Sequence, residues 1–209
     1  MDERVHICNN PAIQEKLAIL RDKDTSDRKF SELVGEMSPL LAYEAMARMP
    51  TTKVEVMTPL APAKGKRITS AIGLVPVLRA ALGMVEGIRR LMPNLRVYHL
   101  GMFRDEETLK PHWYLNKLPP KLTSDGVYFL LDPMLATGNT AVAALGELVE
   151  RGARHIDYIG LIAAPEGVEN VLKHYPHVHI FTAALDERLN EKGYILPGLG
   201  DAGDRQYGT

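Results

Sequence analysis

The stretch VYFLLDPMLATGNTAVAALGELVERG, residues 127–152, passes from an apolar run through one acid into a turn and then into an amphipathic segment. The apolar run has the length and composition of a buried strand, and the spacing of apolar residues after position 140 is typical of a helix. Asp132 closes the expected strand, and PMLATGNT connects it to the helix. A buried strand that leads through a short turn into a helix is the repeating unit of a parallel α/β sheet.

The same alternation continues on both sides of this unit. We expect helices and strands in the following order: strand 68–75, helix 78–92, strand 96–103, strand 127–132, helix 140–152, strand 155–164, helix 167–175 and strand 179–185. Alternating strands and helices indicate a parallel sheet that is covered on both faces. The pattern therefore predicts a doubly wound, mainly parallel α/β fold in a single domain that spans residues 1–209.

Two segments lie outside this alternation. Residues 10–48 carry two helical patterns and predict an N-terminal helical arm, in which Pro39 should kink or interrupt the second helix. Residues 104–126 are polar, contain several prolines and hold the only tryptophan, Trp113, so they predict a protruding hairpin or flap. The apolar face of the arm would pack on the main domain or on a partner subunit, and we expect a homodimer or a larger homo-oligomer.

Composition narrows the class of protein. The 25 Lys and Arg residues nearly balance the 26 Asp and Glu residues, which leaves a formal charge of -1 and no basic field for nucleic acid or an anionic membrane. The single cysteine, Cys8, cannot form an intramolecular disulfide, and a reducing cytoplasm is the expected location. The first ten residues, MDERVHICNN, are charged where a secretory signal needs an apolar core. We expect no nucleic-acid or membrane partner.

The turn itself is a candidate anion site. Ligands of parallel sheets bind beyond the carboxyl ends of the strands, where helix N-termini present free N–H groups. Thr137, Asn139 and Thr140 add side-chain donors, and Gly138 lets the backbone approach a phosphate. An ordinary strand-to-helix turn would fit the same residues. No lysine lies in the turn, so it differs from the phosphate loop of nucleotide triphosphatases, and Asp132 is placed to meet ribose hydroxyls.

At this level of detail LLDPMLATGNTA resembles the phosphoribosyl-pyrophosphate (PRPP) loop of type I phosphoribosyltransferases, and its Asp-Pro-Met form is similar to that of the uracil phosphoribosyltransferases. Many relatives carry two adjacent acids before the loop, whereas here Pro133 takes the second position. VPVLRAALGM, GMFRDEETLKP and GYILPGLGDAGDRQYGT extend the resemblance over nearly the whole chain. It implies transfer of the 5-phosphoribosyl group from PRPP to uracil, giving UMP and pyrophosphate, with Mg²⁺ bound to PRPP and with GTP as an effector in some members.

The resemblance also implies roles for individual residues. Arg79 and Arg104 would hold pyrophosphate. A helix that begins at Arg79 after a turn at Pro76, and a strand that ends at Arg104, would bring both to the same edge of the sheet. Asp132, Arg104 and Asp201 would be catalytic. The PRPP site would comprise Arg79, Arg104, Asp132, Pro133, Met134, Leu135, Ala136, Thr137, Gly138, Asn139, Thr140 and Asp201.

The glycine-rich C-terminal segment would form a hood over the base. Ile195, Gly200 and Ala202 would contact uracil through their backbone, with Asp201 between the base and the phosphoribosyl group. The segment has no helical or strand period, so a frayed tail would also fit. Two further functions remain open, a transferase for another base and an RNA-binding regulator on the same fold; the C-terminal segment disfavours the first and the balanced charge the second.

Two other patterns predict only surface structure. His174, His177 and His179 lack an acid or a fourth ligand nearby, so they indicate a polar turn that leads into a strand and no dedicated metal site. KGKR, residues 64–67, indicates a solvated loop.

Overall fold

The computed structural model describes residues 2–104 and 111–209. Within them a nine-stranded sheet forms the centre of the molecule, and the path of neighbouring strands runs β1-β11-β10-β8-β4-β6-β7, with β5 beside β4 and β9 beside β10. The strands of this sheet are β1 (Val5–Ile7), β4 (Ile72–Leu78), β5 (Arg96–Val97), β6 (Leu100–Arg104), β7 (Pro111–Asn116), β8 (Val127–Leu131), β9 (Met134–Leu135), β10 (His155–Ala163) and β11 (His179–Leu185). Each pair is parallel except β6 with β7, which confirms the predicted doubly wound, mainly parallel α/β fold.

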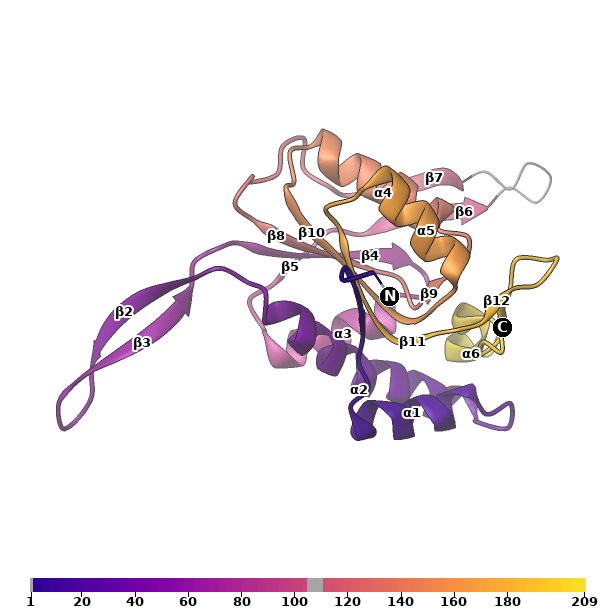
Figure 1. Cartoon of the computed structure of the whole chain (residues 1–209), viewed down its shortest axis with the longest axis horizontal. Helices are drawn as coiled ribbons and strands as arrows, with labels where there is room; N and C mark the ends of the chain where they lie inside the picture. Colours follow the sequence, from indigo (N-terminus) through magenta and orange to yellow (C-terminus); the bar gives the residue numbers. More distant parts are fainter. Residues whose placement is uncertain (1, 105–110) are drawn as a thin grey trace.

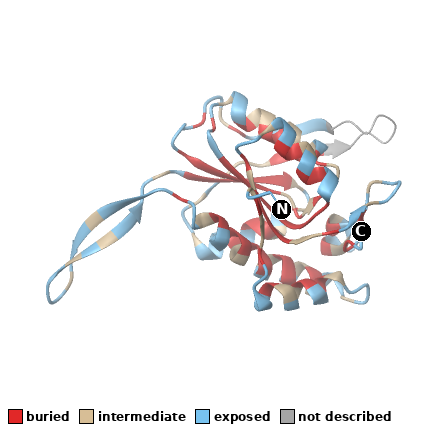
Figure 2. Cartoon of the chain, viewed as in Figure 1, coloured by how far each residue is buried: buried red, intermediate tan, exposed pale blue. Residues whose placement is uncertain are grey.

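Helices cover both faces of the sheet (Figure 1). The helices are α1 (Pro11–Arg21), α2 (Asp27–Met46), α3 (Leu82–Leu91), α4 (Asn139–Glu150), α5 (Pro165–His174) and α6 (Ala202–Tyr207). Two apolar cores result, one shared by α1, α2 and α3 with the sheet and the other by α4 and α5. Burial is deepest in the central strands, and every residue of β8 is buried, which explains its unbroken apolar sequence (Figure 2).

The expected interruption at Pro39 is wrong, because α2 continues through this residue. Proline lacks the N–H that would bond to the carbonyl of Gly35 four residues earlier. At this point α3 packs directly against α2, and a Cβ added to Gly87 would lie 2.2 Å from the Gly35 carbonyl oxygen. The carbonyl that Pro39 leaves without an intrahelical donor therefore lies against the backbone of α3. The two predicted helices of the arm are present, but they form one layer of the main body.

The placement of Pro76 in a turn is also wrong. Pro76 lies inside β4 and pairs with Leu131 of β8. On the other side of β4, pairing with β5 ends at Leu74 and pairing with β6 starts at Val77, so a residue without an N–H falls at a break in the ladder. The helix that was expected to begin at Arg79 begins three residues later, at Leu82.

Two segments that the sequence predicts to be irregular form small ordered elements. Residues 64–67, expected as a loop, belong to β3 (Pro62–Ile68), which pairs with β2 (Thr51–Met57) in a hairpin that projects from the body (Figure 1). The C-terminal segment is ordered as β13 (Ile195–Leu196), paired with β12 (Arg188–Leu189), followed by α6. The predicted flap corresponds to the antiparallel pair of β6 and β7, and residues 105–110 of that flap lie outside the described residues.

None of the helices in the described part of the chain is both long enough and apolar enough to cross a bilayer.

Candidate active site

The predicted site residues meet at the carboxyl edge of the sheet. Asp132 directly follows β8, Arg79 directly follows β4, and β6 ends at Arg104. These three strands are parallel, with β4 between the other two. The C-terminal segment approaches the same edge, beside the ends of β10 and β11 (Figure 1). Residues separated by more than a hundred positions in the sequence therefore surround one region.

The turn after β8 leaves a helix N-terminus uncapped. Gly138 is the N-cap of α4 with a φ of 78°, a conformation that suits glycine, and α4 has no side-chain cap hydrogen bond. The first N–H groups of a helix have no intrahelical partner, and the positive end of the helix dipole lies there. Residues 137–141 thus present N–H groups that can donate hydrogen bonds to a phosphate group.

Helix α5 supports this turn from outside, a role that the sequence analysis missed. A Cβ on Gly167 would lie 2.3 Å from the carbonyl oxygen of Ala136, so only glycine permits this close packing. The Asn170 amide nitrogen donates to the carbonyl of Thr137 at 2.8 Å and to Oδ1 of Asn139 at 3.0 Å. The side chain of Asn139, expected as a phosphate donor, therefore has one of its two polar atoms engaged by α5.

The residues of the turn differ in whether their backbone groups are already hydrogen-bonded within the protein. The carbonyl of Pro133 accepts from the N–H groups of Leu161 and Ile162, at 2.9 and 3.2 Å, and the carbonyl of Leu135 accepts from Ala164 at 2.8 Å. These two residues anchor the turn to β10, and their side chains are buried. Thr137 and Thr140 are half-buried, in the part of the turn that reaches the start of α4.

Asp132 is an acid held in an unfavourable environment. Burial at the end of β8 raises the pKa of its carboxyl group from 3.8 to about 7, and the negative charge of Asp201 adds to the increase, while the N–H of Met134 opposes it. The Asp132 carbonyl accepts from the hydroxyl of Tyr158 at 2.8 Å, which fixes the backbone beneath the carboxyl group. The structure thereby brings Asp132 and Asp201, predicted from distant segments, within electrostatic reach of each other.

Arg79 lies on an exposed turn between β4 and α3. Its guanidinium carbon is 6.0 Å from the centre of the Tyr207 ring, and the Tyr207 hydroxyl donates to the Arg79 carbonyl at 3.3 Å. The Gln206 amide nitrogen donates to the neighbouring carbonyl of Ala80 at 2.7 Å. The short helix α6 therefore supports the Arg79 turn. For Arg104 the structure describes only the backbone, at the end of β6.

The hood has a defined backbone. Gly198 and Gly200 adopt φ values of 67° and 78°, and Ile195 and Ala202 are buried on either side of them. The carbonyls of Tyr194 and Leu196 accept from Asn190 and Glu187 in the β12–β13 pair, so the backbone groups of Ile195 face the opposite side of the strand. Asp201 caps α6 by accepting from the N–H of Asp204 at 2.9 Å.

Within the described residues, no group of three or more His, Cys, Asp or Glu side chains could hold a metal ion. His6 Nε2 and His179 Nδ1 lie 2.9 Å apart on neighbouring strands, remote from the carboxyl edge. The three-histidine pattern is thus split between a helix end, a turn and a strand, as the prediction of a polar turn requires.

The fold is that of the type I phosphoribosyltransferases. The uracil phosphoribosyltransferase family model matches residues 7–209. A uracil phosphoribosyltransferase of Shouchella clausii is 51% identical over 207 residues, and one of Roseiflexus sp. strain RS-1 is 53% identical over 206, with 99% of each chain covered in both cases. The solved structure of the AQ2163 protein of Aquifex aeolicus superimposes with a TM-score of 0.90 at 38% identity and covers 97% of each chain.

The chain belongs to the uracil phosphoribosyltransferase family, as the sequence resemblance predicted. It is accordingly a phosphoribosyltransferase, an enzyme of the glycosyltransferase class.

Proposed function

We propose that this chain, acting as one domain, transfers the 5-phosphoribosyl group of PRPP to uracil and releases pyrophosphate, a reaction of pyrimidine salvage. One observation carries the proposal. The uncapped start of α4, the acid Asp132 and the hood residue Asp201 lie together at one edge of the sheet. This arrangement offers N–H groups for a phosphate, a carboxylate for ribose hydroxyls and a backbone segment for the base. They follow one another in the order of the phosphate, ribose and base of UMP.

In this proposal the turn binds the 5′-phosphate and the ribose. The N–H groups of residues 137–141 would donate to the phosphate oxygens, with the hydroxyls of Thr137 and Thr140 as further donors. The Asp132 carboxylate would accept from ribose hydroxyls, which would replace the water that burial removed. Pro133, Met134 and Leu135 would contribute by anchoring the turn to β10.

The arginines would bind the leaving group. Cleavage of the C1–O bond leaves negative charge on pyrophosphate and positive charge on the ribose ring. Arg79 and Arg104 would stabilise the first, and the carboxylates of Asp132 and Asp201 the second. Orientation of the two substrates supplies the remaining acceleration without a covalent nucleophile. Cys8 does not offer one, because burial raises the pKa of its thiol to about 11.

Mg²⁺ would enter with PRPP. Phosphoribosyltransferases use Mg²⁺ together with PRPP, and two carboxylates beside the site fit a cation carried by the pyrophosphate, since they would otherwise repel that anion. When bound, the ion supplies charge neutralisation of the pyrophosphate group. Asp132 and Asp201 would hold the ribose end of the same substrate.

The base would be read by the hood. Uracil presents two carbonyls on either side of an imide N–H, an edge that the backbone at Ile195, Gly200 and Ala202 can match. Cytosine places an amino donor where uracil has an oxygen and would leave a buried donor unpaired, which disfavours it by several powers of ten. Purines would not fit the same space.

A radiolabelled-uracil assay with and without PRPP tests the proposal. We expect UMP to form only when PRPP and Mg²⁺ are present, with 5-fluorouracil accepted and cytosine and hypoxanthine refused. Turnover of hypoxanthine or cytosine at the rate of uracil would contradict the base assignment. The absence of any PRPP-dependent product would contradict the activity itself.

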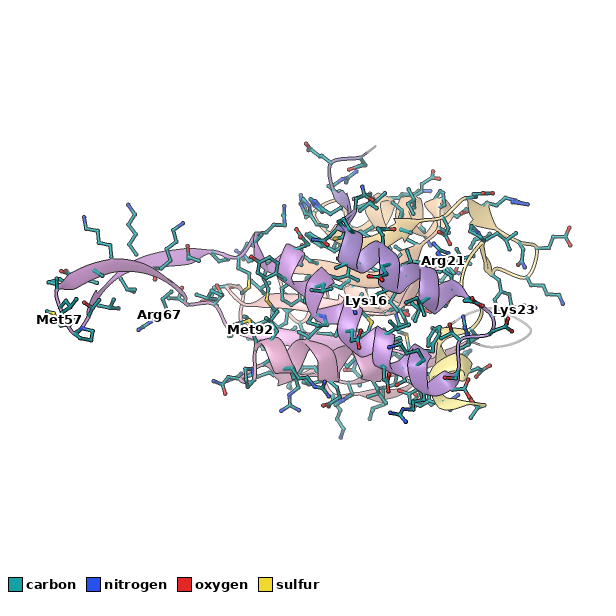
Figure 3. All side chains as sticks on the ribbon, turned by 90° about the horizontal axis from the view of Figure 1, so that it is seen from below. Lys16, Arg21, Lys23, Met57, Arg67 and Met92 are labelled. Carbon is teal, nitrogen blue, oxygen red and sulfur yellow. The ribbon has the colours of Figure 1, made fainter. Side chains whose placement is uncertain are left out.

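The proposal includes a homo-oligomer in which the β2–β3 hairpin clasps a second copy of the chain. The hairpin projects from the body, with Met57 near its tip (Figure 3). Met57 and Leu60, which lies in the turn between β2 and β3, are 77% and 97% exposed. An isolated two-stranded hairpin is only marginally stable in water, and exposed apolar side chains at its end favour a protein partner. Light scattering should show a dimer or larger assembly that Met57→Ser with Leu60→Ser weakens and that Lys66→Ser leaves intact.

GTP is proposed as an effector, since it activates some members of the resembled family. A cytoplasmic location is also proposed, because the single cysteine, Cys8, is unpaired and a reducing compartment suits it. Initial rates at subsaturating PRPP should rise when GTP is added. Identical rates over a GTP titration would remove GTP from the proposal.

A further inference from the structure

The glycine at the centre of the hood is held from both of its backbone sides. Gly198 N–H donates to Asp186 Oδ2 at 2.9 Å, and the Gly198 carbonyl accepts from Nη1 of Arg21 at 2.6 Å. Arg21 also binds Asp186, through Nη1 to Oδ2 at 2.8 Å and through Nη2 to Oδ1. Three residues from the end of α1, the end of β11 and the hood thus form a closed network.

A second arginine ties the next hood residue to the same place. Arg205 Nη1 donates to the carbonyls of Leu199 and Leu20, at 2.8 and 2.9 Å. Its guanidinium carbon lies 4.5 Å from the centre of the Phe30 ring. Leu20 and Arg21 are the last two residues of α1, and Arg21 lies at this end of the helix (Figure 3). The hood is therefore attached to the end of one helix by two adjacent contacts.

Stability alone does not account for a charged pair at this position. The side chain of Asp186 is 4% exposed and that of Arg21 is 22% exposed, so both groups lose most of their hydration. The desolvation of a buried ion pair offsets much of its Coulomb attraction, and an apolar pair is often equally stabilising. The rigid guanidinium group also fixes the position of its partners, because its N–H groups can donate to the carboxylate and to the Gly198 carbonyl in only one arrangement.

We propose that Arg21, through Asp186, is a positioning residue for the base, which sets the place of the hood over uracil. The inference rests on the proposed function, in which the hood reads the base. Ile195 and Gly200 lie three and two residues from Gly198, within one short turn. A shift of Gly198 moves both, and it changes the backbone edge that faces uracil while the PRPP turn stays in place.

The conservative variant Arg21→Lys separates positioning from a general structural role. Lysine keeps the charge next to Asp186 but cannot bind the carboxylate and the Gly198 carbonyl with one rigid fork. We expect the KM for uracil to rise about tenfold or more, which corresponds to about 1.4 kcal/mol, with the KM for PRPP changed by less than about twofold. Asp186→Asn should give the same selective change, and the double variant should be less impaired than the sum of the two, because both belong to one network.

The matched control is Lys16→Ala, which removes the exposed Lys16–Glu36 ion pair from the same helix without touching the hood. Equal increases of both KM values in Arg21→Lys and Asp186→Asn, or the same pattern in Lys16→Ala, would overturn the inference. If Arg21→Lys fails to fold, Asp186→Asn alone decides, with thermal unfolding as the check. A wild type that does not transfer to uracil would instead refute the proposed function.

Discussion

Replacement of Asp132 by asparagine should make the protein more stable and less active. The pKa of this carboxyl group is raised from 3.8 to about 7 because burial disfavours its charged form. Above pH 7 the folded protein holds an ionised carboxylate at a free-energy cost that the unfolded chain avoids. Asparagine has the same shape, can still accept from the N–H of Met134, and cannot ionise. The charge of Asp132 lowers the stability of the fold, so we attribute its presence to ligand binding.

The size of the effect follows from linkage. A pKa raised from 3.8 to about 7 is equivalent to about 4 kcal/mol at full burial. Asp132 is partly accessible at the end of β8, so solvent screening reduces this value, and we expect about 1–2 kcal/mol. The sign is set by the raised pKa: the wild type loses this stability as pH rises from about 4 to about 7. The two proteins should be nearly equally stable near pH 4 and should differ fully at pH 8.

Urea unfolding of both proteins at several pH values measures this difference. The same variant should lose most of its kcat/KM for PRPP at pH 8. The wild type should show an acid limb below about pH 7, and this limb should be missing from the profile of the variant. Asp157→Asn is the matched control, since Asp157 is buried at the opposite edge with a pKa raised to about 6. It should change stability but not kcat/KM. A stability difference that does not vary with pH, or wild-type kcat/KM in Asp132→Asn, would refute the reasoning.

Three other substitutions test the remaining parts of the site. Arg79→Ala should weaken the binding of PRPP by about 1.5–3 kcal/mol and the binding of UMP little, because UMP has no pyrophosphate. Calorimetry that shows equal losses of binding free energy for both ligands would contradict this. Asn170→Ala should raise the KM for PRPP about fivefold or more by releasing the carbonyl of Thr137. Asn116→Ala should not, because it removes only hydrogen bonds to Glu147, at the end of α4 away from the turn, and to the N–H of Leu118. Gly200→Val should raise the KM for uracil with PRPP binding kept, because its φ of 78° disfavours a branched side chain beside the base; an unchanged KM for uracil would move the base pocket elsewhere.

Local sequence was sufficient where local physics decides the structure. The apolar run 127–131 is a strand because it is buried on both faces, and Gly138 starts the helix because its φ suits glycine. These features use neighbouring residues only, so the strand, turn and helix could be predicted together. The parallel sheet followed from the repetition of the same unit.

The predictions that were wrong concern positions whose structure depends on distant elements. Pro39 does not interrupt α2, and the Gly35 carbonyl that it leaves without an intrahelical donor lies against Gly87 of a different helix. Pro76 is tolerated in β4 because two separate strands meet beside it. Proline rules describe the local cost of a missing N–H, whereas packing and strand pairing with distant elements also decide whether a helix or strand forms there. The β2–β3 hairpin was missed because its mixture of charged and apolar residues is exposed on both faces and lacks a clear alternation.

The residues that support the site escaped prediction for a related reason. Asn170 and Gly167 act on the phosphate turn from α5, and Arg21 acts on the hood across 177 positions of sequence. None of them belongs to a motif, because each meets its target only after the sheet has formed. A ligand-binding turn needs free N–H groups and glycines that leave it weakly held by itself. Contacts from distant elements must then supply the rigidity that the turn lacks, and the polar side chains on α1 and α5 are placed to do so.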